Sequence, residues 1–181
     1  IGELQTSLNN PLALRNLAGV LAALHSTGVD DNDLRKAVAE LDLDVAGRMQ
    51  LLPRGDVLWV NDSYNANPSS FRSVLQSLRQ MYPSRRLLLA AGSMAELGDQ
   101  APELHRQVGV FAADCGVSTL FACGPYASNL AEDWQATTQR LVHVTEEPGD
   151  LLPLLQQTIQ PNDVILVKGS RSARMERILP E

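Results

Sequence analysis

One short segment of the chain, NDSYNANPSS at residues 61–70, combines side chains that suit binding of a polar ligand. It follows the apolar run VLWV and precedes a helix-like stretch. A plain connection needs a glycine or a proline and little else. Residues 62–67 alone supply a carboxylate, a hydroxyl, a phenol and two carboxamides, from Asp62, Ser63, Tyr64, Asn65 and Asn67. Asp62 and Asn67 are also residue types that cap a following helix, and both interpretations stay open here.

Polar groups also follow other apolar runs of the chain. GSMAELG at residues 92–98 contains Ser93 and Glu96, whose spacing favours a capping box at a helix start. Gly124-Pro125-Tyr126 follows the apolar run TLFAC. These segments are therefore candidates for the same site, although a capping box is the favoured interpretation of Ser93 and Glu96 taken alone.

The last polar segment is LVKGSRSARME at residues 166–176. Lys168 ends an apolar run, a position from which a lysine often extends to water. We predict a helix that begins near Ser172, next to Ser170 and Arg171. The free N–H groups at such a helix start favour a carboxylate or a phosphate.

Missing patterns exclude several chemistries. GxGxxG and GxxxxGK[ST] are absent, so this chain alone neither holds NAD in the usual way nor cradles a triphosphate. Cys115 and Cys123 fit no zinc or redox spacing, and we expect them to be buried thiols in a reducing cytoplasm. His25, His105 and His143 follow no metal-binding spacing. The net charge of −6 and the lack of a basic stripe argue against a nucleic-acid surface, and no apolar run is long enough to span a bilayer.

Strand-like and helix-like segments alternate after residue 61, and these elements must position the polar loops. The predicted strands are short continuous apolar runs at 87–92, 119–124, 140–144 and 164–169. The predicted helices are at 69–81, 102–115, 127–134 and 150–159. Such runs are typical of a parallel sheet covered on both faces. We predict an α/β, Rossmann-like, doubly wound and mostly parallel sheet, with a short hairpin of MQLL and VLWV at its start. The polar loops should then converge at the carboxyl edge of the sheet.

The first part of the chain has a different pattern, which predicts two helices. Asn9-Asn10-Pro11 is a typical helix start, and Gly28 is a typical helix end. Asp30-Asp31 then begins a second helix. The change of pattern near Arg48 predicts a boundary between residues 1–48 and 49–181. We interpret the first residue, Ile rather than Met, as a sign that the sequence belongs to a longer protein.

The segments NDSYNANPSS, GSMAELG and LVKGSRSARME occur in the order and spacing of the carboxyl-terminal domain of the Mur ligases, and the chain resembles that family from about Asn9 to its end. SYNANP and KGSRS favour the members that add D-alanyl-D-alanine to UDP-N-acetylmuramoyl-tripeptide during synthesis of the peptidoglycan precursor. The resemblance implies an enzyme of three domains. Residues 1–48 would be the helical tail of its central ATP-binding domain, and residues 49–181 its Rossmann-like carboxyl-terminal domain.

The resemblance also implies the reaction and its cofactors. The family uses ATP and Mg²⁺ to phosphorylate a carboxylate, and an amine then attacks the acyl phosphate to form an amide. The P-loop and the metal ligands belong to the central domain, so we expect no metal ligand here and no activity of this chain alone. The expected partners are UDP-N-acetylmuramoyl-tripeptide, D-Ala-D-Ala and the missing amino-terminal and central domains of the same cytoplasmic protein, with no nucleic acid and no membrane span.

Residue roles follow from the same resemblance. Arg48 matches a catalytic arginine that reaches the ATP phosphates, where a guanidinium suits a transferring phosphoryl group. Asp62 matches the acidic residue that binds the ATP ribose, and Asn16 and Tyr64 are further candidates for the ATP site. The candidates for the substrate cleft and the incoming dipeptide are Ser63, Asn65, Asn67, Lys168, Ser170 and Arg171.

The sequence departs from the family pattern in three places. Asn61 and Ser93 stand where the family usually has Asp, and the His-Asn pair common ahead of the first helix is missing. Two alternatives stay open. One is another Mur or folylpolyglutamate-type ligase with the same domain, and the other is a stand-alone module that binds a nucleotide or a small acid without catalysis. A Rossmann-type oxidoreductase is less favoured because the glycine fingerprint is missing.

Overall fold

The structure is a computed structural model that describes residues 3, 4, 6, 8, 11–41, 45–134 and 140–180. It divides into two compact units, Ile1–Asp44 and Val45–Glu181. The assignment of the first unit to a central ATP-binding domain stays a prediction.

The first unit contains two helices, as predicted. Helix α1 spans Pro11–Ser26, and helix α2 spans Asp31–Ala39. Asp30 caps α2, because its side chain accepts a hydrogen bond from the backbone N–H of Asn32 at 2.8 Å. The small core of this unit is formed by Leu21, Leu34 and Val38. The predicted cap at Asn9-Asn10 lies outside the described residues.

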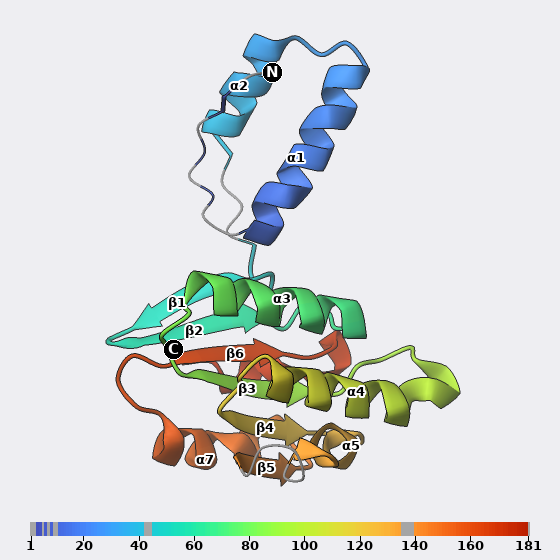
Figure 1. Cartoon of the computed structure of the whole chain (residues 1–181), viewed down its shortest axis with the longest axis vertical. Coiled ribbons are helices and arrows are strands. Elements are labelled where there is room, and N and C mark those ends of the chain that lie inside the picture. The colour runs from blue at the N-terminus through green and yellow to red at the C-terminus, as the bar shows by residue number, and fades with distance from the viewer. Residues whose placement is uncertain are drawn as a thin grey trace. The chain divides into compact units, whose positions relative to one another are not determined.

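The second unit is built on a six-stranded sheet of order β1-β2-β6-β3-β4-β5 (Figure 1). The strands are β1 (Gln50–Arg54), β2 (Val57–Asp62), β3 (Leu87–Gly92), β4 (Thr119–Cys123), β5 (Leu141–Thr145) and β6 (Val164–Lys168). β1 and β2 form the predicted antiparallel hairpin, and the other neighbouring pairs are parallel. The last strand of the described residues, β6, therefore lies in the middle of the sheet. The predicted α/β, mostly parallel fold is confirmed.

Helices cover both faces of this sheet. Helices α3 (Pro68–Met81), α4 (Ala101–Asp114) and α5 (Ala127–Ala131) pack on one face. Helix α7 (Leu151–Thr158) and the 3₁₀ turn η4 (Met175–Ile178) pack on the other. Every residue of β3, β4 and β6 is buried. Burial on both faces explains why these strands are continuous apolar runs rather than alternating ones.

Three further 3₁₀ turns are η1 (Gly98–Gln100), η2 (Pro148–Asp150) and η3 (Arg171–Ala173). The helix predicted from near Ser172 is wrong, because η3 and η4 replace it. Arg174 separates the two turns in a left-handed conformation with φ of +50°, which interrupts a continuous helix. The anion-binding helix start predicted at Ser170 is therefore not formed.

Arginine side chains tie together the amino ends of the central strands. Arg86 donates two hydrogen bonds, at 2.8 and 2.7 Å, to the carboxylate of Asp163, whose side chain is 2% exposed. The neighbouring Arg85 donates to the backbone carbonyls of Asp56, Asn162 and Asp163. The arginine pair is therefore part of the structure that joins β2, β3 and β6.

Replacing Gly109 with alanine should destabilise the second unit. A Cβ atom at this position of α4 would lie 2.0 Å from the backbone oxygen of Leu130 in α5. Because a backbone atom cannot rotate away, the two helices must separate, at a cost of about 3 kcal/mol. Urea denaturation measures the difference. Gly19→Ala is the matched control, because a Cβ there meets nothing within 4 Å and should leave stability equal or slightly higher. Equal stability of Gly109→Ala and wild type would contradict this packing.

Candidate functional site

The polar loops follow the carboxyl ends of neighbouring parallel strands. β2 pairs with β6, β6 with β3, and β3 with β4, all in parallel. The segments after these strands therefore lie along one edge of the sheet. Two groups of contacts occur along this edge, one after β2 and β6 and the other after β3, β4 and β6.

An ion pair joins the ends of β2 and β6. Lys168 Nζ donates to Asp62 Oδ2 at 2.6 Å and to the backbone oxygen of Asn65 at 3.0 Å. The Lys168 side chain is only 2% exposed, so the predicted extension into water is wrong. The ammonium also lies 5.4 Å from the centre of the Phe71 ring. Lys168 is thus a buried cation held by β2 and by the loop that follows it.

The carboxylate of Asp62 is fixed at both oxygens and still reaches the surface. Oδ2 accepts from Lys168, and Oδ1 accepts from the backbone N–H of Met49 at 2.9 Å. The side chain is 18% exposed. A carboxylate has about four acceptor positions, so this group retains capacity for donors from a ligand. Asp62 does not cap α3, which settles one of its two predicted interpretations.

The segment before β1 packs against the same loop. Gly47 has φ of +75°, and its carbonyl accepts from the backbone N–H of Tyr64 at 3.0 Å. A Cβ on Gly47 would lie 3.1 Å from that nitrogen, so a side chain there would press on the loop. This packing brings the guanidinium of Arg48 to 4.1 Å from the centre of the Tyr64 ring, as a cation–π contact. Both side chains are exposed.

The other residues of the loop mainly stabilise its own conformation. Ser63 is 1% exposed and donates from Oγ to Asn61 Oδ1 at 2.7 Å. The side chain of Asn65 accepts from the backbone N–H of Ala66. Asn67 caps α3 and forms a capping box with Ser70, which confirms the capping interpretation for this residue.

A second group of contacts joins the loops after β3, β4 and β6. Ser170 donates from both its backbone N–H and its Oγ to the carbonyl of Ser93, at 3.0 and 2.8 Å. Ser93 Oγ accepts from the backbone N–H of Tyr126 at 3.3 Å. The capping box predicted for Ser93 and Glu96 is not formed, since the next turn begins only at Gly98 and Glu96 has φ of +61°.

A cavity of about 400 Å³ opens beside these loops. Burial raises the pKa of the Cys123 thiol in its wall to about 12, so this group is neutral near pH 7. The charged lining comes from Glu146 and Glu147, after β5. The lining residues are Ser93, Met94, Ala95, Cys123, Gly124, Pro125, Tyr126, Glu146, Glu147, Pro148, Ser170, Ser172 and Ala173.

The predicted site residues are thus distributed over several places. Arg48, Asp62, Tyr64, Asn65 and Lys168 lie in the first group of contacts, and Ser170 lies in the second. Ser63 and Asn67 hold the loop after β2.

Two predicted residues lie apart from these groups. Arg171 is exposed, and its guanidinium is 3.8 Å from the carboxylate of Glu176. Asn16 lies on α1 in the first unit, where it is exposed.

Sequence reasoning missed two contributors to this edge. The backbone N–H of Met49 has no signal in a sequence pattern, because any residue except proline supplies one. Glu146 and Glu147 follow β5 directly, and their place after a predicted strand was a usable signal.

Two kinds of feature are absent from the described part of the chain. No helix there combines the length and apolar character needed to cross a membrane. No cluster of three or more His, Cys, Asp or Glu side chains there is arranged to hold a metal ion.

Comparison with known proteins relates this geometry to one family. Residues 47–171 match the model of the Mur ligase, glutamate ligase domain. A UDP-N-acetylmuramoyl-tripeptide–D-alanyl-D-alanine ligase of Mycobacterium tuberculosis is 36% identical over 146 residues, which cover 70% of this chain and 29% of that protein. The chain therefore spans about a third of the length of such relatives.

Solved structures show the same relationship. MurF from Acinetobacter baumannii superposes with a TM-score of 0.81 at 25% identity, covering 97% of this chain and 38% of that one. MurF ligase from Thermotoga maritima, solved in complex with ADP, superposes with a TM-score of 0.74 at 26% identity, covering 91% and 36%. The chain belongs to the Mur ligase family, and it corresponds to the carboxyl-terminal portion of the MurF members.

Proposed function

We propose that this chain is the part of an ATP-dependent ligase that receives a nucleotide and an incoming dipeptide, in the joining of D-alanyl-D-alanine to UDP-N-acetylmuramoyl-tripeptide. The main support is the Asp62 carboxylate, which Lys168 and Met49 hold in place while part of it stays accessible. A preorganised acceptor beside an exposed arginine suits a nucleotide. The names of the relatives and the ADP-bound MurF ligase of Thermotoga maritima support the same ligand class.

We assign the first group of contacts to ATP. The free acceptor positions of Asp62 suit the two ribose hydroxyls. Arg48 is exposed beside the Tyr64 ring and free to extend toward phosphate oxygens, where a guanidinium stabilises developing negative charge. Asn16 is proposed to lie near the adenine. The residues present therefore fit a nucleotide, and ATP supplies the phosphoryl group that activates the tripeptide carboxylate.

We assign the cavity after β3, β4 and β5 to the dipeptide. Its volume of about 400 Å³ lies within the range of small-molecule sites. Ser170 and Ser172 line it, and their hydroxyls are 3.0 Å apart. Arg171 stands between them in the sequence, is exposed, and is proposed to bind the dipeptide carboxylate. Lys168 is proposed to act on Asp62 instead, because two of its three N–H donors bind Asp62 and Asn65 and its side chain is only 2% exposed.

The remaining parts of the reaction are expected outside this chain. The sequence contains no GxxxxGK[ST] pattern, so the P-loop and the ligands of Mg²⁺ are proposed to belong to the central domain of the complete cytoplasmic enzyme. In this proposal Ser63, Asn65 and Asn67 shape the cleft between nucleotide and dipeptide. Their hydrogen bonds within the loop suit a fixed wall rather than a mobile one.

A ligation assay on the complete protein tests the proposal. We expect release of ADP and phosphate that requires both UDP-N-acetylmuramoyl-tripeptide and D-Ala-D-Ala, with one dipeptide joined for each ATP consumed. Residues 1–181 alone should form no amide under the same conditions. ATP binding by the complete protein without dipeptide transfer would favour the binding-module alternative, and transfer of glutamate to a folate would favour the folylpolyglutamate-type alternative.

A further inference from the structure

His105, on helix α4, is fully buried, and both of its ring nitrogens have partners. Nδ1 lies 2.6 Å from the backbone oxygen of Ala101. Because a carbonyl oxygen only accepts, Nδ1 carries the proton of the neutral ring. Nε2 is then free to accept, and it receives the backbone N–H of Met94 at 2.8 Å. The two contacts together define a single neutral tautomer.

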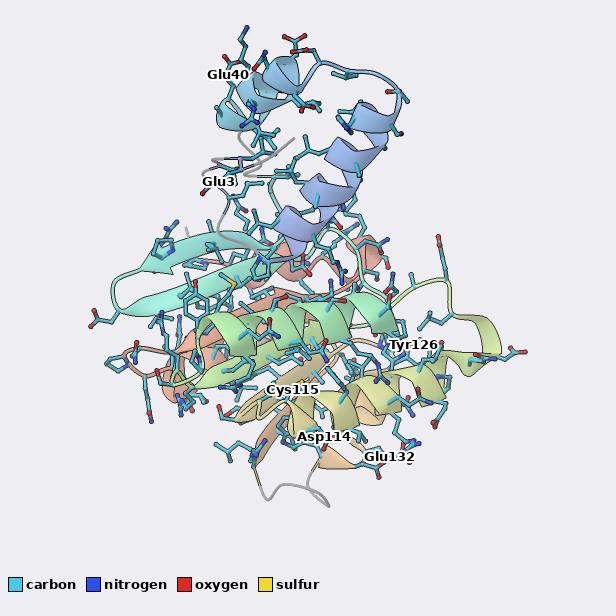
Figure 2. The ribbon with its side chains drawn as sticks, turned by 45° about the horizontal axis from the view of Figure 1, so that its top comes forward. Glu3, Glu40, Asp114, Cys115, Tyr126 and Glu132 are labelled. Carbon is cyan, nitrogen blue, oxygen red and sulfur yellow. The ribbon has the colours of Figure 1, made fainter. Side chains whose placement is uncertain are left out.

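The same ring contacts a second loop. His105 stacks on Tyr126, with ring centres 4.5 Å apart and 23° between the ring planes. Met94 follows β3 and Tyr126 follows β4, and both line the cavity. Figure 2 shows Tyr126 apart from Asp114 and Cys115, the last residue and the C-cap of α4. One buried imidazole therefore supports two walls of the cavity at the functional edge.

We propose that His105 is a positioning residue for the cavity, which keeps the Met94 and Tyr126 walls in the geometry that the dipeptide requires and makes dipeptide binding sensitive to acid. This rests on the proposed assignment of the cavity to the dipeptide. The imidazole does not itself line the cavity, so its effect passes through Met94 and Tyr126.

Acid should disrupt this arrangement. A proton on Nε2 would face the N–H of Met94, and two donors cannot bond to each other. Burial lowers the pKa of His105 below its ordinary 6.5, although the hydrogen bond to Ala101 opposes the shift. The titratable group that faces the ring is the Tyr126 phenol, and its other described polar contacts are backbone atoms. The stabilising contribution is therefore complete above about pH 6.5 and is lost as the pH falls through the lowered pKa of the folded protein.

The test compares His105→Leu with His105→Gln in the complete enzyme. Leu removes both hydrogen bonds and leaves the buried N–H of Met94 without its acceptor. We therefore expect the KM for D-Ala-D-Ala to rise by about tenfold, with the KM for ATP unchanged. A glutamine oxygen accepts from the Met94 N–H, so His105→Gln should restore most of the affinity. It should also lose the acid decline of kcat/KM for the dipeptide, since an amide does not titrate near neutral pH.

A cavity-filling variant separates this inference from the proposed function. Ala95→Trp places an indole at an exposed position of the cavity wall and should raise the KM for D-Ala-D-Ala. If it has no effect, the assignment of the cavity to the dipeptide is wrong. If Ala95→Trp weakens dipeptide use while folded His105→Leu and His105→Gln match wild type, His105 has no positioning role. An equal rise in both KM values for the His105 variants would indicate a general folding defect and would also overturn the inference.

Discussion

Asp62→Ala in the complete enzyme is expected to raise the KM for ATP by about 30-fold and to change the KM for D-Ala-D-Ala much less. The carboxylate is proposed to accept hydrogen bonds from the ribose hydroxyls, and a bond to a charged group contributes about 1.5–3 kcal/mol, or roughly ten- to a hundredfold in affinity. Steady-state kinetics with each substrate varied in turn measures the two KM values. Equal increases for ATP and the dipeptide would contradict a role at the ribose.

Ribose-modified nucleotides sharpen this test. Wild type should use 2′,3′-dideoxy-ATP as poorly as Asp62→Ala uses ATP, while the variant should no longer distinguish the two nucleotides. Asp62→Asn retains an acceptor for Lys168 and reports the contribution of charge alone. Asp114→Ala serves as the matched control. It removes an exposed carboxylate at the last residue of α4 (Figure 2), and we expect no change in either KM. Undiminished discrimination against the dideoxy nucleotide in Asp62→Ala would place the ribose elsewhere.

Lys168→Met should give the largest loss of stability together with weaker use of ATP. The substitution leaves the largely buried Asp62 carboxylate without its cation, and breaking such a pair costs about 3 kcal/mol or more in unfolding free energy. Because Lys168 also fixes the backbone at Asn65, the loop that carries Tyr64 should lose its defined position. Urea denaturation of residues 1–181 measures the stability, and ATP kinetics of the complete enzyme measures the effect on the site.

A double-mutant cycle isolates the pair itself. Lys168→Met combined with Asp62→Asn should cost at least about 1 kcal/mol less than the sum of the two single changes, because the second change removes a charge that the first left unpaired. Additive losses would mean that the 2.6 Å contact contributes little in solution. The same cycle on the KM for ATP separates a positioning role of Lys168 from a direct contact with substrate.

Much of the fold was predictable because burial on both faces imposes a simple pattern. Strand β3 begins and ends at the predicted residues, Leu87 and Gly92, and the hairpin of β1 and β2 formed as expected. The start of α3 followed from Pro68 and the capping capacity of Asn67. In each case the signal lies within a few neighbouring residues. The end of the chain was mispredicted because the left-handed conformation of Arg174 has no such local signal.

The site was less predictable because its contacts join residues that are distant in the sequence. Lys168 and Asp62 are 106 positions apart, and a lysine after an apolar run gives no sign of whether it will meet water or a carboxylate. His105 was unremarkable in the sequence, since its partners are the backbone atoms of Ala101 and Met94. Arg86 likewise gave no indication that it would bind a buried Asp163.

The pairing of β6 with β2 affects how the sheet reaches its correct strand register. Asp62 and Lys168 are register partners on adjacent strands. A slip of the register by one residue would turn the lysine to the other face of the sheet and leave its charge unpaired. The ion pair between Asp62 and Lys168 therefore favours the correct register of the two strands. Because Lys168 follows Asp62 by 106 positions, the proposed nucleotide contact can form only after β3, β4 and β5 have been synthesised. A chain that stops before β6 would lack it.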